Sequence, residues 1–196
     1  MQTRKEAIRR SILDSARKRF LQDGYLGATM RDIAADAGCS LGNLYTYFSN
    51  KDDLLVEVVK PTLTAIRKAL TAARVQDDSQ DDRADSTSLA RSMEESAEAL
   101  AAFVDDRRDE LSLLLLRHEG SSLAHVPESL AQELTEFLAC RMHSVPPPFV
   151  EAATRSSFFL HCYATFLVNC LVEALKHEVP GKALPELIRS IARLTR

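Results

Sequence analysis

The sequence predicts an all-α protein of about nine helices, with an N-terminal three-helix head and a C-terminal helical bundle. Apolar residues recur at helical spacing along most of the 196-residue chain. Proline and glycine are scarce, with 7 and 6 copies, and they cluster between the segments with helical spacing. A hydrophobic share of 45% is enough to build a core, and the length fits one ordinary domain or a small domain fused to a medium one.

The first predicted helix runs from Thr3 to Gly24. Thr3 and Glu6 form a capping box, in which each side chain satisfies a backbone N–H group at the start of the helix. Gly24 is expected to end the helix in a left-handed conformation. The residues between them place an apolar stripe on one face: Ile8, Ile12, Leu13, Ala16 and Phe20.

Two short helices should follow, joined by a turn that contains glycine. Thr29 is a suitable cap for the first of them, and Gly38 stops it. Ser40 caps the second, which is expected to extend from Leu41 to about Phe48. Two short helices with such a turn describe a helix-turn-helix.

The rest of the chain is predicted to form six more helices. The first of these is capped by Ser49 or Asn50, runs to about Arg74 and is kinked at Pro61. Residues 76–88 are polar and acidic, which predicts a mobile loop. The remaining helices are expected at residues 89–104, 107–118, 127–143, 149–177 and 183–195. We therefore expect a head at residues 1–50 and a body at residues 51–196.

Charge divides the chain in a similar way. Residues 1–51 contain nine Lys or Arg and five Asp or Glu, which gives a formal charge of +4. Since the whole chain has a net charge of −3, the remaining residues carry −7. A basic head on an acidic body suits a protein that contacts phosphate at one end. The N-terminus has no apolar segment typical of a signal peptide, and the most apolar run, Phe158 to Val172, is too short to span a bilayer. We expect a cytoplasmic protein with reduced thiols and no membrane partner.

Cofactors, metals and catalysis are not expected. The four cysteines form no CxxC pair, and the five histidines have no ligand spacing. Arg117, His118 and Glu119 are adjacent, so on a helix their side chains diverge by about 100°. No nucleophile or metal-binding set accompanies them, so the sequence predicts that the protein is not an enzyme.

Residues 29–51 read TMRDIAADAGCSLGNLYTYFSNK, and glycines, caps, aromatics and a final lysine recur together at one spacing. With flanking positions from Ile8 to Leu55, this stretch resembles the DNA-binding domain of TetR-type (tetracycline-repressor-like) regulators. The resemblance covers about a quarter of the chain. It implies that residues 41–47 form a recognition helix for the major groove of double-stranded DNA, and that the body binds an effector and dimerises.

The candidate DNA-binding residues follow from local chemistry and from this resemblance. Thr29 and Arg31 begin a helix, whose exposed N–H groups form a phosphate site. Gly42 allows close approach to a base, and Asn43 can pair with an adenine edge or a phosphate. By resemblance, Tyr45 and Tyr47 contact DNA and Lys51 contacts a phosphate, although Tyr45 could instead be a core residue. The predicted set is Thr29, Arg31, Ser40, Leu41, Gly42, Asn43, Tyr45, Tyr47 and Lys51.

The last two helices are expected to form the dimer. In TetR-like proteins they pack against their copies as a four-helix bundle, and here the corresponding apolar residues are Leu160, Ala164, Leu167, Leu171, Leu187 and Ile191. A twofold dimer presents two recognition helices to half-sites about one DNA turn apart, so the operator should be palindromic.

A second line on the same long helix contains polar or polarisable residues. Buried polar groups need partners, so this line is interpreted as the wall of an effector pocket. The predicted pocket residues are Phe158, Cys162, Thr165 and Asn169, with Met93, Phe103 and His118 from other helices. Alternatively, Thr165 bonds back to its own helix and Asn169 is satisfied across the dimer seam.

Together these patterns predict a ligand-responsive DNA-binding transcriptional regulator. Its most direct form is a repressor that a small-molecule effector releases from a palindromic operator. Two other functions stay open: a helical small-molecule-binding protein that does not read DNA, and a thiol redox sensor that uses Cys162 and Cys170.

Overall fold

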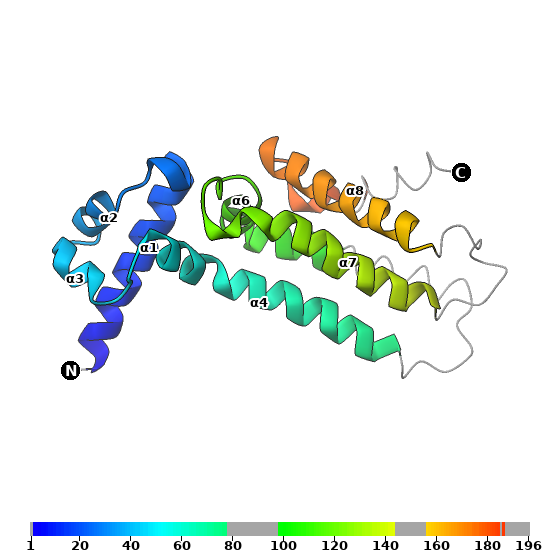
Figure 1. Ribbon diagram of the computed structural model, residues 1–196, viewed down its shortest axis with the longest axis horizontal. Coiled ribbons are helices and arrows are strands. Elements are labelled where there is room, and N and C mark those ends of the chain that lie inside the picture. Colours follow the sequence, from blue (N-terminus) through cyan, green and yellow to red (C-terminus); the bar gives the residue numbers. More distant parts are fainter. Residues whose placement is uncertain (1, 78–97, 144–155, 185, 187–196) are drawn as a thin grey trace. The chain divides into compact units, whose positions relative to one another are not determined.

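The computed structural model describes residues 2–77, 98–143, 156–184 and 186 of the chain (Figure 1), and these residues contain helices and no strand. The all-α prediction is confirmed. The α-helices are α1 (Gln2–Gly27), α2 (Met30–Asp36), α3 (Leu41–Tyr45), α4 (Lys51–Asp77), α6 (Arg108–Leu115), α7 (Val126–His143) and α8 (Ser157–Lys176). Residues 98–106 are also helical, and two 3₁₀ turns lie at Ser122–His125 (η1) and Gly181–Ala183 (η3).

Two compact units make up the chain. The first contains Met1–Ile66 and Asp109–Pro127, and the second contains Arg67–Arg108 and Glu128–Arg196. The first unit thus combines the three head helices with the start of α4 and with most of α6. The predicted boundary at residue 50 separates a DNA-binding head from an effector-binding body. This functional division stays a prediction.

The first unit has one apolar core. Its fully buried side chains come from α1, α2, α3, α4 and α6, so each helix contributes to the same interior: Ile12, Phe20, Ile33, Leu44, Leu54, Leu55, Val59, Leu113 and Leu114. The predicted inner faces of the three head helices are confirmed by this burial. Shared burial of large side chains fixes the short helices α2 and α3, which are too short to be stable alone.

Gly24 interrupts α1 as the sequence predicts. Its φ is +69° and its ψ is 175°, a backbone conformation that favours glycine. The element nevertheless continues to Gly27, because the N–H of Ala28 donates to the carbonyl of Gly24 at 3.1 Å. The side chain of Thr3 lies outside the described residues, so the predicted capping box stays a prediction.

The long helix α8 starts later than predicted. Ser156 has an extended backbone, and its hydroxyl accepts a hydrogen bond from the N–H of Phe159 at 3.2 Å. A capping serine in this conformation ends any helix that approaches it from the N-terminal side. The predicted helix at residues 149–177 is therefore wrong at its start, and α8 begins at Ser157.

Two more predicted segments lie largely outside the described residues. The helix α4 continues to Asp77, and residues 78–97, which contain most of the predicted loop, are not described. Of the predicted last helix, only residues 183, 184 and 186 are described.

In the second unit, the segment after α8 is fastened to the helix at residues 98–106. The N–H of Gly181 donates to the Asp105 carboxylate at 2.7 Å, and a β-carbon on Gly181 would come within 2.3 Å of the Ala101 carbonyl oxygen. Arg108 donates to the carbonyl of Val179 at 2.5 Å. Glycine is therefore required at position 181 for this close approach.

Candidate nucleic-acid interface

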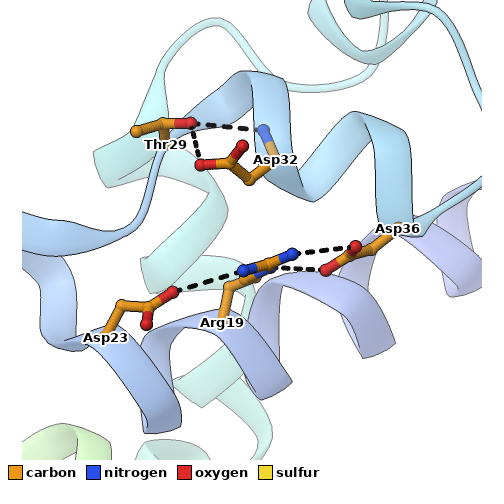
Figure 2. Close-up of polar contacts among 5 residues, drawn as sticks. All are labelled: Arg19, Asp23, Thr29, Asp32 and Asp36. Atoms are coloured by element: carbon orange, nitrogen blue, oxygen red, sulfur yellow. Dashed lines mark hydrogen bonds and ion pairs between the residues drawn. The ribbon is translucent and has the colours of Figure 1, made fainter.

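The N-terminus of α2 is capped by Thr29. Figure 2 shows that its hydroxyl accepts a hydrogen bond from the N–H of Asp32 at 3.2 Å and donates to the Asp32 carboxylate at 2.6 Å. The predicted cap is confirmed. Thr29, Arg31 and Asp32 are all exposed, so this helix end presents a hydroxyl, a cation and an anion to solvent.

Ser40 caps α3 in the same manner, with its hydroxyl accepting from the N–H of Asn43 at 3.1 Å. The helix ends at Tyr45, earlier than the predicted end near Phe48. The N–H groups of Thr46 and Tyr47 donate to carbonyls three residues back, at 3.0 and 2.9 Å, which is the bonding of a tighter 3₁₀ turn. The predicted seven-residue recognition helix is therefore five residues of α-helix followed by a turn.

The outward side of α3 carries the residues that were predicted to read DNA. Gly42 and Tyr45 are exposed, whereas Leu41, Asn43 and Tyr47 are half-buried. The side chain of Tyr45 is 49% exposed, so its interpretation as a core residue is wrong. No atom lies within 4 Å of the position that a β-carbon on Gly42 would take, so the backbone there is open to a ligand. Whether these residues contact DNA stays a prediction.

A bidentate ion pair holds α2 on α1. Figure 2 shows the Arg19 guanidinium donating to both carboxylate oxygens of Asp36, at 2.5 and 3.0 Å, with Asp23 at 3.6 Å on its other side. The hydrogen bond from Arg19 holds the pKa of Asp36 below its ordinary value. Two parallel bonds from a planar group fix orientation as well as distance.

The start of α4 resolves the choice between two predicted caps. The side-chain oxygen of Asn50 accepts a hydrogen bond from the N–H of Asp53 at 2.8 Å, and its amide nitrogen donates to the Asp53 carboxylate at 3.1 Å. Asn50, rather than Ser49, is the capping residue. The helix therefore begins at Lys51.

The half-buried side chain of Lys51 has partners within the protein. Its amine donates to the carbonyl oxygens of Tyr25 and Ala28, at 2.5 and 2.9 Å, and lies 4.3 Å from the centre of the Tyr25 ring. Burial lowers the pKa of this amine. The predicted phosphate contact stays a prediction, but the structure gives Lys51 internal partners that the sequence did not indicate.

A turn after α6 is joined to the same region. The N–H of Tyr25 donates to the carbonyl of Arg117 at 3.1 Å, and the N–H of Ser122 donates to the Asp52 carboxylate at 2.9 Å. Gly120 has a φ of +81°, and a β-carbon there would come within 2.6 Å of the Leu26 side chain. Residues 117–122 therefore pack directly against the end of α1 and the start of α4.

The sequence did not indicate these braces. Arg19 and Asp36 are 17 residues apart, and Asp52 and Ser122 are 70 apart. Neither separation matches a helical neighbour, so only the tertiary fold pairs them. Charged and polar residues are common on solvated helices, so the local sequence around these four residues does not indicate that they form long-range contacts.

The predicted dimer stripe faces the chain's own core. Leu160 and Ala164 are 2% and 0% exposed, so their side chains are already covered within the chain. Leu167 and Leu171 are half-buried, while Leu187 and Ile191 lie outside the described residues. Whether this stripe contributes to a dimer interface stays a prediction.

The predicted pocket line on α8 faces outward. Phe158, Cys162 and Asn169 are exposed, and Thr165 is half-buried. The buried side chains of α8 are Leu160, Ala164, Ala174 and Leu175, and the pocket stays a prediction. Of the other predicted pocket residues, Met93 lies outside the described residues, and Phe103 and His118 are half-buried.

The described residues contain no group of three or more His, Cys, Asp or Glu side chains that could hold a metal ion. Among them, α8 has the length and apolar composition of a helix that crosses a membrane.

Comparisons with known proteins show what the N-terminal segment is similar to. Residues 12–58 match the model for bacterial regulatory proteins of the tetR family. The regulator BetI of Agrobacterium fabrum is 34% identical over 68 residues, which cover 35% of this chain and 33% of that protein. The regulator HbdR of Aromatoleum sp. is 40% identical over 58 residues, covering 30% and 25%. The matched segment thus spans a third or less of these curated relatives.

Solved structures share the fold along nearly the whole chain. NalD of Pseudomonas aeruginosa, a repressor of the MexAB-OprM multidrug efflux pump, has a TM-score of 0.62 at 22% identity, covering 96% of this chain and 95% of its own. MexZ, a Pseudomonas aeruginosa repressor, has a TM-score of 0.59 at 20% identity, covering 93% and 92%. The helix-turn-helix segment at residues 12–58 is thus similar to the bacterial regulatory proteins of the tetR family, and the solved structures share the all-helical fold.

Proposed function

We propose that the protein is a ligand-responsive DNA-binding transcriptional regulator, and specifically a repressor that a small-molecule effector releases from a palindromic operator. The main observation behind the proposal is the capped helix α3. Its inner residue Leu44 is buried, and its outer residues Gly42 and Tyr45 are exposed to solvent. A rigid helix-turn-helix with an open outer face is suited to the DNA major groove.

The residues around α3 divide into two roles under this proposal. Thr29 and Arg31, at the N-terminus of α2, anchor phosphates, because that helix end is exposed and carries a cation. Gly42, Asn43 and Tyr47 contact base edges, with Leu41 against a thymine methyl group, while Ser40 and Tyr45 contact the backbone. Phosphate contacts position the protein, and base contacts specify the sequence.

A dimer of this chain would use the outer aromatic face of α8, which we define as Phe158, Phe159, Tyr163 and Phe166. These side chains are 77%, 43%, 36% and 41% exposed in the single chain. Phe159 and Tyr163 stack with ring centres 6.3 Å apart, so the face is an ordered aromatic surface. Large exposed aromatic surfaces are unfavourable in water, and a second α8 packed on this one would bury them on both chains.

The effector is proposed to bind against His118. Among the described residues of the predicted pocket, His118 supports a ligand contact best, because its buried Nδ1 has no hydrogen-bond partner. Burial lowers the pKa of this imidazole, so it is neutral near pH 7 and can donate or accept one hydrogen bond.

Binding to DNA from the protein's own upstream region, measured by gel shift and by fluorescence anisotropy, tests the proposal. We expect saturable binding that excess random-sequence duplex does not abolish at moderate salt. The footprint on the DNA should have twofold symmetry, and the protein should sediment as a dimer. A folded dimer that binds no duplex at low salt would support instead a helical small-molecule-binding protein.

The thiol redox function is weaker on structural grounds. Cys170 is half-buried, and burial raises the pKa of its thiol, which leaves less of the reactive thiolate. Cys162 is exposed, and unchanged DNA affinity after oxidant treatment would remove this alternative.

A further inference from the structure

The chain leaves α8 through a hydrogen-bonded turn, residues 177–181, which we name the exit turn. Its second residue, Glu178, has a φ of +52°. The N–H of Glu178 donates to the carbonyl of Leu175 at 3.3 Å. The N–H of Val179 donates to the carbonyl of Ala174 at 2.8 Å. This pair of bonds is a Schellman motif, which satisfies carbonyl groups at the end of a helix.

The left-handed position of this motif is occupied by a residue with a side chain. Glycine is the usual residue there, because a β-carbon disfavours a positive φ. In the part of the chain that the structure describes, Glu178 is the only residue other than glycine with a positive φ. Such a conformation persists when the surrounding structure holds it, so contacts from outside the exit turn are needed.

Two charged residues near the start of α6 supply these contacts within the second compact unit. The Arg108 guanidinium donates to the carbonyl of Val179 at 2.5 Å and to the Asp105 carboxylate at 3.1 Å. The same carboxylate oxygen accepts a hydrogen bond from the N–H of Gly181 at 2.7 Å. The hydrogen bonds from Gly181 and then from Arg108 hold the pKa of Asp105 below its ordinary value. The carboxylate is therefore ionised at neutral pH, where it is the stronger acceptor.

Gly181 brings the exit turn against the helix at residues 98–106. A β-carbon on Gly181 would lie 2.3 Å from the Ala101 carbonyl oxygen and 2.6 Å from the carboxylate carbon of Asp105. Leu184, three residues further on, has helical dihedral angles and is buried. Contacts within one chain thus fix the direction in which the backbone continues after α8.

This direction bears on the proposed dimer. The outer aromatic face of α8 precedes the exit turn, and Leu187 and Ile191, which the sequence predicts for the interface, follow it outside the described residues. A segment that is already ordered before association loses less conformational entropy when an interface forms. A preset exit turn would therefore raise the affinity of the two chains for each other.

We propose that Asp105 and Arg108 are positioning residues for the dimer, which hold the exit turn so that the segment after it is preset for a second copy of this chain. This proposal rests on the dimer in the proposed function. Both residues act through the backbone of Val179 and Gly181, and neither needs to contact the partner chain.

Sedimentation equilibrium of the full chain tests the proposal through the dissociation constant of the dimer. Asp105→Ala removes the acceptor of the Gly181 N–H in each of the two chains. At about threefold for each lost hydrogen bond, the constant should rise about tenfold. Asp105→Asn keeps an acceptor oxygen, so its constant should stay within about threefold of the wild-type value. An unchanged constant in Asp105→Ala overturns the proposal.

A matched control separates positioning from a general loss of stability. Val104 is 1% exposed in the same helix as Asp105, so Val104→Ala leaves a cavity without removing a partner of the exit turn. It should lower the melting temperature and leave the dissociation constant of the dimer unchanged. If Val104→Ala and Asp105→Ala raise the constant equally for equal losses of melting temperature, Asp105 has a structural role alone and the proposal is wrong.

Amide hydrogen exchange in the wild-type protein tests whether the exit turn forms before association. In protein diluted until it is monomeric, the Gly181 N–H should exchange as slowly as in the dimer, because its acceptor belongs to the same chain. This measurement needs no variant to fold. Fast exchange in the monomer with slow exchange in the dimer would show that the partner forms the turn, which contradicts the proposal.

Binding to duplex from the protein's own upstream region separates this proposal from the proposed function. Above its raised dissociation constant, the Asp105→Ala dimer should bind the duplex with wild-type affinity, because mass action restores the dimer. Weak binding at every protein concentration contradicts the proposal. A wild-type protein that binds the duplex as a monomer overturns both the proposed dimer and this proposal. A wild-type dimer that binds no duplex overturns the DNA-binding function alone, and sedimentation and exchange still decide the role of Asp105.

Discussion

The carboxylate of Asp52 accepts a hydrogen bond from the backbone N–H of Ser122 at 2.9 Å, across 70 residues of sequence. Asp52 lies in the first turn of α4, and Ser122 lies in the turn that follows α6. Hydrogen bonds from Ser122 and from the hydroxyl of Tyr25 therefore connect the end of the head, the start of α4 and residues 117–122.

Replacing Asp52 with alanine should lower the free energy of unfolding at neutral pH by about 1 kcal/mol, because the N–H of Ser122 loses its acceptor. Burial raises the pKa of Asp52, but the hydrogen bonds from Ser122 and Tyr25 outweigh it and hold the pKa below the ordinary 3.8. The folded pKa is thus lower than the unfolded one. The stabilisation is complete above the unfolded value and is lost as the pH falls through the folded value. Urea unfolding at several pH values should show the two proteins converging in acid, and a difference that persists or grows below that range would contradict this assignment.

The Arg19–Asp36 ion pair should depend on the planar guanidinium. Arg19→Lys keeps the charge but cannot form two parallel bonds to the Asp36 carboxylate. We expect faster amide exchange in α2 and weaker DNA binding, with little change in the salt slope, since the Arg19 guanidinium is paired with the Asp36 carboxylate. Lys18→Ala, at the exposed neighbouring position, is the control and should leave α2 unchanged. Equal exchange in both variants would show that the brace does not hold α2.

Asn43 should affect specificity, whereas Arg31 should affect affinity for all sequences. Asn43→Ala is expected to cost about 1–3 kcal/mol on the selected operator and much less on random DNA, since a base contact is lost. Arg31→Ala should weaken both by a similar factor. Anisotropy titrations with the two duplexes measure the ratio, and equal losses on both duplexes for Asn43→Ala would refute its role as a base reader.

The outer aromatic face of α8 should carry the dimer, and the inner stripe should carry the fold. Phe166→Glu is expected to give a folded monomer, because a charge on an exposed face hinders association without disturbing the interior. Leu160→Ala should lower the stability of the protein by about 2–5 kcal/mol through a core cavity while leaving the exposed face intact. Sedimentation and thermal unfolding separate the two effects. A dimer that survives Phe166→Glu would rule out this face.

Capping of α4 should depend on Asn50 and not on its neighbour. Asn50→Ala should destabilise the protein by about 1 kcal/mol, because the N–H of Asp53 loses the acceptor that it has at 2.8 Å. Ser49→Ala is the matched control, since Ser49 is exposed and its neighbour Asn50 accepts from the N–H of Asp53. A larger loss of stability for Ser49→Ala than for Asn50→Ala would reverse the assignment.

The sequence by itself determined the local structure of the head. Thr29 and Ser40 cap their helices, Gly24 adopts a positive φ, and Leu44 is buried, all as predicted. These features depend on neighbours within four residues, where hydroxyl acceptors, the missing side chain of glycine and helical periodicity act directly. The prediction of an all-α protein with a helix-turn-helix needed nothing more.

Only the tertiary structure decided which contacts form between distant segments. It paired Arg19 with Asp36 and Asp52 with Ser122, and it turned the amine of Lys51 toward the carbonyl oxygens of Tyr25 and Ala28. It also decided which face of α8 is buried. This helix is apolar on most of its surface, so its sequence does not indicate a single buried face. Packing against the rest of the chain buried Leu160 and left Phe158 exposed. Burial of a helix face is a property of its neighbours as much as of its own residues, and the sequence of one helix cannot supply it.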